Sequence, residues 1–110
     1  MIEQIVPVVP VSKIQVVADA LTPIGFELSW QHNPGQNLIY AEFTHPDGVA
    51  LHASESRGDG VGPVAVYFRV SNVDELAARA GATAEDQTWH MREFWIRDSD
   101  GNTYRFGQPV

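Results

Sequence analysis

Aromatic and charged side chains suited to binding a small molecule share one face of the predicted strands. Strict alternation assigns to this face Tyr40, Glu42, Ala50, His52, Ala65, Tyr67, Arg69, Glu93, Trp95, Arg97, Thr103 and Arg105. Tyr40, Tyr67 and Trp95 can stack on a planar ligand. Glu42 and Glu93 can neutralise a cation or act as an acid/base pair. We expect these carboxylates to form structural ion pairs with the arginines of the same face, in preference to catalysis.

The strands that carry these side chains belong to a chain that repeats itself. Val11-Ser12 matches Val70-Ser71 at an offset of 59 residues, and Asp47-Gly48 matches Asp100-Gly101 at an offset of 53. Each half has the order strand, helix, strand, strand, strand. The sequence therefore predicts one domain of two modules, residues 1–54 and 63–110, joined by a linker at 55–62.

Helix starts, turns and apolar positions follow the same repeat. Ser12 with Gln15, and Asn72 with Glu75, have the form of capping boxes, which predicts helices from Ser12 to about Leu21 and from Asn72 to Gly81. Turns are expected at 33–37, 45–48 and 98–102. The residues expected to face the helices are Ile39, Ala41, Phe43, Leu51, Val66, Phe68, Phe94, Ile96, Tyr104 and Phe106.

Composition narrows the class of protein. The 110 residues include 7 basic and 14 acidic ones, a net charge of -7, which disfavours duplex nucleic acid as a partner. The chain has no cysteine, so disulfides, thiol nucleophiles and Cys-based metal sites are excluded. The apolar start from Ile5 to Val11 is interrupted by Pro7 and Pro10, is too short to span a membrane and lacks a basic flank. We expect a cytoplasmic globular protein with no membrane partner.

Two adjacent segments carry a family resemblance. Trp89-His90-Met91-Arg92-Glu93-Phe94 and Arg97-Asp98-Ser99-Asp100-Gly101-Asn102 resemble the signature of the vicinal oxygen chelate superfamily. That signature reads W-G-x-R-E-F followed by R-D-P-x-G-N, so His90 replaces a glycine and Ser99 a proline. The superfamily includes glyoxalase I, extradiol dioxygenases and bleomycin resistance proteins. The resemblance implies an α+β fold of two βαβββ modules forming a curved, half-open eight-stranded mixed sheet, commonly within a dimer.

The resemblance also defines where a metal would bind. Metal-dependent members take one ligand from the first and one from the last strand of each module, and these positions correspond to Val6, His52, Ala65 and Arg105. Valine and alanine have no donor atom, and arginine stays protonated. One imidazole cannot hold a catalytic divalent ion, which needs about three protein ligands. We therefore expect neither a metal nor another cofactor at these positions.

The leading functional hypothesis is a metal-independent binding protein similar to bleomycin resistance proteins, with a role in antibiotic resistance. Those proteins sequester a cationic, aromatic drug in crevices at the interface of a homodimer. The expected ligand-binding residues are Tyr40, Glu42, His52, Tyr67, Arg69, Glu93, Trp95 and Arg105. Three alternatives remain: a metal-dependent glyoxalase- or dioxygenase-type lyase or isomerase with a divergent site, a metal-free enzyme using Glu42 or Glu93, and an interaction domain without a small ligand.

Overall fold

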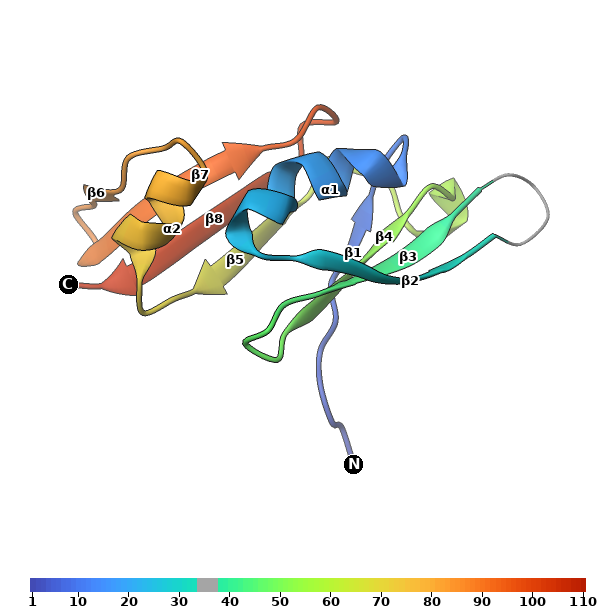
Figure 1. The fold of residues 1–110 in the computed structure, drawn as a ribbon, viewed down its shortest axis with the longest axis horizontal. Coiled ribbons are helices and arrows are strands. Elements are labelled where there is room, and N and C mark those ends of the chain that lie inside the picture. Colours follow the sequence, from blue (N-terminus) through green and yellow to red (C-terminus); the bar gives the residue numbers. More distant parts are fainter. Residues whose placement is uncertain (34–37) are drawn as a thin grey trace.

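The computed structural model describes residues 1–33 and 38–110. Two helices lie on one side of the strands, and residues 1–7 extend away from the body of the protein (Figure 1). In chain order the elements are β1 (Val8–Pro10), α1 (Ile14–Leu21), the 3-10 turn η1 (Thr22–Ile24), β2 (Glu27–His32), β3 (Tyr40–Thr44), β4 (Ala50–Ser54), the 3-10 turn η2 (Arg57–Asp59), β5 (Ala65–Arg69), α2 (Val73–Arg79), β6 (Glu85–Asp86), β7 (Met91–Arg97) and β8 (Thr103–Pro109).

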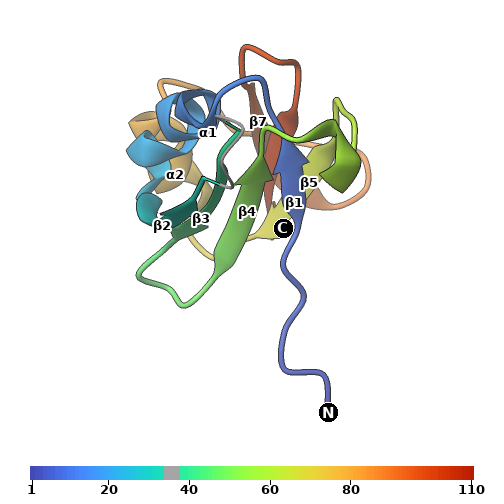
Figure 2. The same cartoon turned by 90° about the vertical axis from the view of Figure 1, so that its right-hand side faces the viewer.

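The strands of each module form a separate four-stranded mixed sheet. Their orders are β1-β4-β3-β2, here called sheet A, and β5-β8-β7-β6, here called sheet B. In both sheets the first strand runs parallel to the last and the other pairs are antiparallel. Figure 2, which looks along the molecule from the sheet A end, shows both helices on the same side. The α+β class and the two βαβββ modules are confirmed, with the eight strands divided between two sheets.

The register of the first strands shows which residues lie beside His52 and Arg105. Val8 lies opposite His52 in sheet A. In sheet B, Tyr67 lies opposite Arg105, and Ala65 pairs with Thr103. Val6 and Ala65 thus each stand two residues before the residue directly opposite His52 or Arg105. The pairing in sheet A starts late because Pro7 has no N–H, so Pro7 contributes only its carbonyl oxygen, which accepts from His52 N at 2.9 Å.

One hydrophobic core runs through both modules. All ten residues expected to face the helices belong to this core or pack against it. Phe106 stacks between Phe94 and Phe68, with ring centroids 4.7 Å apart on each side. Phe26 of the first module meets Phe68 edge-to-face at 5.8 Å, so the aromatic series crosses the boundary between the modules.

The side chains of the two predicted capping boxes form other hydrogen bonds than those expected. Ser12 does not cap α1, as had been predicted; its N and Oγ both bond to Asp100, at 2.6 and 2.9 Å. The N-cap of α1 is Lys13, without a side-chain bond. α2 does begin after Asn72, but the Asn72 side chain bonds to Glu75 at 2.9 Å instead of to backbone. Spacing within the helix cannot reveal such long-range partners.

Other expectations were met in part. The strand expected at 84–90 is reduced to β6, because Gln87 N bonds to Met91 O at 2.7 Å and closes a turn in which His90 has a φ of 65°. The turn expected at 33–37 lies outside the described residues from position 34 onward. Within residues 1–33 and 38–110, the helices are too short to cross a bilayer.

Candidate functional site

A hydrogen-bonded chain of Tyr40, His52 and Glu42 lies on the face of sheet A that turns away from the helices. The Tyr40 hydroxyl is 2.7 Å from His52 Nδ1, and His52 Nε2 is 3.1 Å from Glu42 Oε2. Register explains the contact, because Glu42 and His52 are directly opposed on β3 and β4. The geometry fits a histidine that carries its proton on Nε2, accepts from the phenol and donates to the carboxylate.

Within this hydrogen-bonded group, the Tyr40 hydroxyl stays protonated. Burial raises the pKa of Tyr40, and the negative charge of Asp59 raises it further. Tyr40 therefore remains a hydrogen-bond donor at neutral pH, which favours orientation of His52 over generation of a phenolate nucleophile.

The neighbouring strand β2 extends the aromatic surface. Its register shifts between Leu28 and Trp30, so Trp30 faces the open side opposite Glu42 and meets the Tyr40 ring edge-to-face at 6.4 Å. Ser29, the residue at this irregularity, donates to Glu42 Oε1 at 3.2 Å. Trp30 and Ser29 were not among the predicted site residues, because alternation cannot foresee a bulge.

Sheet B carries a second cluster around Glu93. This side chain is 2% exposed although it lies on the open face. Its Oε2 accepts from the Tyr67 hydroxyl at 2.7 Å and from Trp89 Nε1 at 3.3 Å. Burial, followed by the bond to Glu93, raises the pKa of Tyr67 against the opposing influence of nearby arginines. Tyr67 therefore stays protonated and donates.

Gly107 allows Tyr67 to reach Glu93. Tyr67 is on β5, Glu93 is on β7, and Gly107 on the intervening β8 lies opposite Glu93. A Cβ at Gly107 would collide with the Tyr67 hydroxyl oxygen. Neither Gly107 nor Trp89 was predicted as a site residue. β8 extends through Gly107, beyond the predicted end of this strand at Phe106, and a glycine inside a strand often marks such a close approach.

The arginines of the open face do not pair with these carboxylates. Arg105 lies over the Trp95 ring, 5.4 Å from its centroid, and Arg97 donates to Thr103 Oγ1 at 3.2 Å. Among the described residues, Glu42 forms an ion pair only with His52, and Glu93 forms none. The predicted ion pairs with Arg69, Arg97 and Arg105 were therefore wrong. The register places Tyr67 and Trp95 opposite Arg105, Thr103 opposite Arg97 and Gly107 opposite Arg69, so no carboxylate faces any of these arginines directly.

The side chains at the four positions that the family resemblance assigns to metal ligands do not fit a metal ion. These positions are Val6, His52, Ala65 and Arg105, and the residues directly opposite His52 and Arg105 are Val8 and Tyr67. His52 has both ring nitrogens engaged, and the Tyr67 phenol is bonded to Glu93. Across residues 1–33 and 38–110, no three His, Asp or Glu side chains are grouped as metal ligands.

The signature residues of the last turn are structural. Asp98 Oδ2 accepts from Asn102 Nδ2 at 2.9 Å and from the Tyr104 hydroxyl at 2.8 Å. Asn102 also donates to Pro10 O at 3.0 Å and accepts from Val64 N at 2.9 Å, which ties the first module to the second. This explains why the motif predicts the fold without specifying an activity.

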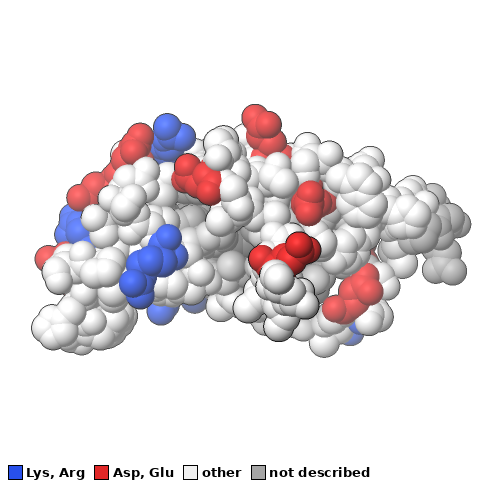
Figure 3. All heavy atoms as spheres, turned by 90° about the horizontal axis from the view of Figure 1, so that it is seen from below, with Lys and Arg blue, Asp and Glu red and all other residues white. Residues whose placement is uncertain are grey.

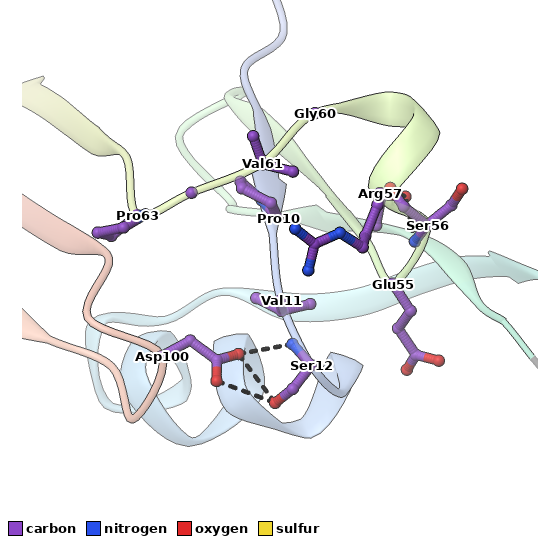
Figure 4. A pocket seen from close by; sticks show the side chains of 12 residues that line it. Pro10, Val11, Ser12, Glu55, Ser56, Arg57, Gly60, Val61, Pro63 and Asp100 are labelled. Atoms are coloured by element: carbon purple, nitrogen blue, oxygen red, sulfur yellow. Dashed lines mark hydrogen bonds between the residues drawn. The ribbon is translucent and has the colours of Figure 1, made fainter.

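A pocket of about 360 Å³ lies beside this junction, away from both clusters. Figure 4 shows Arg57 extending from η2 across the pocket toward Pro10, while Asp100 reaches Ser12 on the opposite wall. A second pocket, of about 330 Å³, lies at the seam between the modules, where Tyr67 and Arg69 meet Phe26 and Val49. The eight predicted site residues are thus divided, with Tyr40, Glu42 and His52 on sheet A and the others on sheet B.

The two halves of the chain also differ in charge. Five of the seven basic residues fall within 63–110. Figure 3 shows Lys and Arg side chains mainly over the half that holds the second module, whereas Asp and Glu side chains occur over both halves. The open face of sheet A carries Glu42, and that of sheet B carries Arg69, Arg97 and Arg105.

Comparison with known proteins supports the fold assignment. No family model and no curated protein matches the chain. Among solved structures, a bleomycin-binding protein complexed with bleomycin is 16% identical, with a TM-score of 0.75 over 99% of this chain and 100% of that one. A bleomycin resistance determinant encoded on transposon Tn5 is 17% identical, with a TM-score of 0.76 over 98% of both chains. A lactoylglutathione lyase from Agrobacterium tumefaciens is 17% identical, with a TM-score of 0.72 over 96% of this chain and 92% of that one. The chain has the fold of these bleomycin-binding and glyoxalase-type structures, a fold that hosts both binding proteins and enzymes.

Proposed function

We propose that this protein is a metal-independent binder of a cationic, aromatic small molecule, held between the open sheet faces of two copies. The observation that carries the proposal is the set of half-exposed aromatic side chains on these faces, placed beside hydrogen-bonded carboxylates. Trp30, Tyr67, Trp89 and Trp95 are 47–56% exposed. Large aromatic rings left in water beside Glu42 and Glu93 suit a flat cation, through stacking and charge neutralisation.

A second copy supplies the missing wall of the cleft. Each open face is one-sided in a single chain, and the two faces differ in charge, acidic with a histidine on sheet A and arginine-rich on sheet B. Apposition of sheet A of one copy with sheet B of the other brings opposite charges together. The N-terminal arm, with Ile2 and Ile5 about 90% exposed, offers further apolar surface for such a contact. We expect light scattering to give twice the mass of one chain, and a monomer at binding concentrations would contradict this arrangement.

Bleomycin is the first ligand to test, because the bleomycin-binding protein of the same fold was solved as its complex. We expect titration with copper-free and copper-loaded drug to give a saturable change in tryptophan fluorescence, reduced in Trp95→Phe and Glu42→Gln. Glu27→Gln, which removes the same charge from an exposed position on β2, serves as the matched control. An unchanged signal at high micromolar drug contradicts bleomycin as the ligand.

Metal-dependent chemistry is tested separately. The side chains at Val6, His52, Ala65 and Arg105 lead us to expect well below one metal ion per chain in protein purified without chelator. Stoichiometric zinc, manganese, nickel or iron would favour the lyase or dioxygenase alternative and contradict the proposed function.

A further inference from the structure

Glu93 has an unused hydrogen-bonding oxygen in a buried setting. Its Oε2 receives both Tyr67 and Trp89, whereas Oε1 is buried and has no hydrogen-bond partner among the described residues. Buried carboxylate oxygens are normally hydrogen-bonded, because water lost on burial must be replaced by another donor. The side chain therefore has capacity for one further donor group.

The surroundings of Glu93 favour a donor from outside the chain. Arg105, the arginine opposite Trp95, is engaged with the Trp95 ring instead of the carboxylate. The aromatic side chains of this face, Tyr67, Trp89 and Trp95, are each about half exposed.

Glu93 helps to line a pocket whose charge favours positively charged ligands. The pocket measures about 330 Å³ and is lined by Ala82, Thr83, Glu85, Glu93, Phe94 and Trp95. Two of these residues are glutamates and none is basic, so the potential in the pocket attracts cations and repels anions. Trp95, which is half exposed, contributes apolar wall for the body of a ligand.

We propose that Glu93 Oε1 is the acceptor for an N–H-bearing ammonium group of a ligand whose apolar body lies against Trp95. This inference rests on the proposed function and sharpens it, because it names the atom that recognises the cation and the kind of cation accepted. An ammonium with at least one N–H satisfies Oε1. A quaternary ammonium of the same charge can use only the aromatic rings and the local potential.

Three probes of matched shape separate these contributions: benzylammonium, benzyltrimethylammonium and benzyl alcohol. The readout is the indole N–H resonance of Trp89, assigned with Trp89→Phe, since this group donates to the same carboxylate. We expect benzylammonium to shift the resonance saturably and to bind about tenfold or more tightly than benzyltrimethylammonium, as a charge-assisted hydrogen bond implies. Benzyl alcohol is expected to bind weakest. Equal affinity for the two cations, or no saturable shift with benzylammonium, overturns the proposal.

Two variants test whether Glu93 is responsible. Glu93→Gln is expected to abolish the preference for benzylammonium, and Glu27→Gln to retain it. Glu93→Gln melting at or above the wild-type temperature supports a ligand-directed charge, whereas a retained preference in this variant overturns the proposal. If Glu93→Gln fails to fold, the comparison of benzylammonium with benzyltrimethylammonium on the wild-type protein still tests whether an N–H group of the cation is recognised.

The outcomes also distinguish this inference from the proposed function. If bleomycin binds wild type and Glu93→Gln equally well, the proposed function stands and the role of Glu93 fails. If bleomycin does not bind but benzylammonium shows the Glu93-dependent preference, the ligand assignment fails and the role of Glu93 stands.

Discussion

Glu55 and Gln108 occupy equivalent positions in the two modules and cap equivalent helices. Glu55 Oε2 accepts from Ile14 N at 2.9 Å, at the start of α1, and Gln108 Oε1 accepts from Val73 N at 3.0 Å, at the start of α2. The two residues are 53 positions apart, the same offset that relates the two Asp-Gly turns. In each module, therefore, the end of the last strand fixes the start of the helix.

Removing either cap should lower stability. We expect Glu55→Ala and Gln108→Ala each to cost about 1 kcal/mol in the free energy of unfolding, the usual value of a helix N-cap. Glu55→Ala should cost more, because Oε1 also accepts from Ile39 N at 3.1 Å. Urea denaturation measures both. Gln15→Ala, whose side chain bonds only to Asp19 within α1, is the control and should change stability by a few tenths of a kcal/mol; equal losses in all three variants would contradict the capping role.

Asn102 should be among the most sensitive positions of the chain. It is fully buried, and Asn102→Ala removes partners from Asp98, Val64 N and Pro10 O at once. We expect a loss of about 2–4 kcal/mol, because several buried polar groups are left unsatisfied. Chemical denaturation with Ser99→Ala as an exposed control in the same turn provides the check. A loss similar to that of the control would show that water replaces these bonds.

Gly107→Ala tests the crossing of Tyr67 over β8. The new Cβ would collide with the Tyr67 hydroxyl and ring, so the bond from Tyr67 to Glu93 must break or the strand must move. We expect a loss of about 1–3 kcal/mol, typical of overpacking. In a Tyr67→Ala background most of that loss should disappear, which a double-mutant cycle measures as coupling energy. Additive losses would indicate that the alanine strains the backbone alone. Gly58→Ala, whose Cβ would make an ordinary contact of 3.5 Å with Ser56 Oγ, is the control.

Tyr104 should make the protein sensitive to alkali. Burial raises its pKa far above the ordinary value near 10, and the hydrogen bond to Asp98 raises it further. Above pH 10 the unfolded chain loses this proton while the folded protein retains it, so the contribution is present in full below pH 10 and declines at higher pH. The slope is up to about 1.4 kcal/mol per pH unit. Melting temperatures between pH 8 and pH 11 should fall more steeply in wild type than in Tyr104→Phe, and parallel curves would contradict the assignment.

The fold could be predicted from the sequence because its signals are local. Alternation assigned Phe43, Leu51 and Phe106 to the helix-facing side correctly, and the Asp98-to-Asn102 motif identified a turn whose contacts are specific to this architecture. The number of strands in each module, and their order along the chain, follow from the same repeat.

The candidate site was harder to predict because it depends on contacts between strands. Pro7 delays the pairing of β1, so Val8 lies opposite His52, and only the position of the neighbouring β4 reveals this register. The contact between Tyr67 and Glu93 depends on Gly107, which lies three strands after Tyr67 in the chain but on the adjacent strand of the sheet. The choice of His52, rather than an arginine, as the partner of Glu42 follows from register and side-chain reach.

The junction made by Asn102 exists in one module only. At the equivalent turn of the first module, His45 stands where the second has Asp98, and Val49 where it has Asn102. His45 instead contacts Ile24 O and its own turn, without reaching the other module. The contact between the modules is thus made by the second turn through Asn102, and the first turn does not duplicate it. An epitope inserted after Asp47 should accordingly be tolerated, whereas the same insertion after Asp100 would pull the halves of the protein apart.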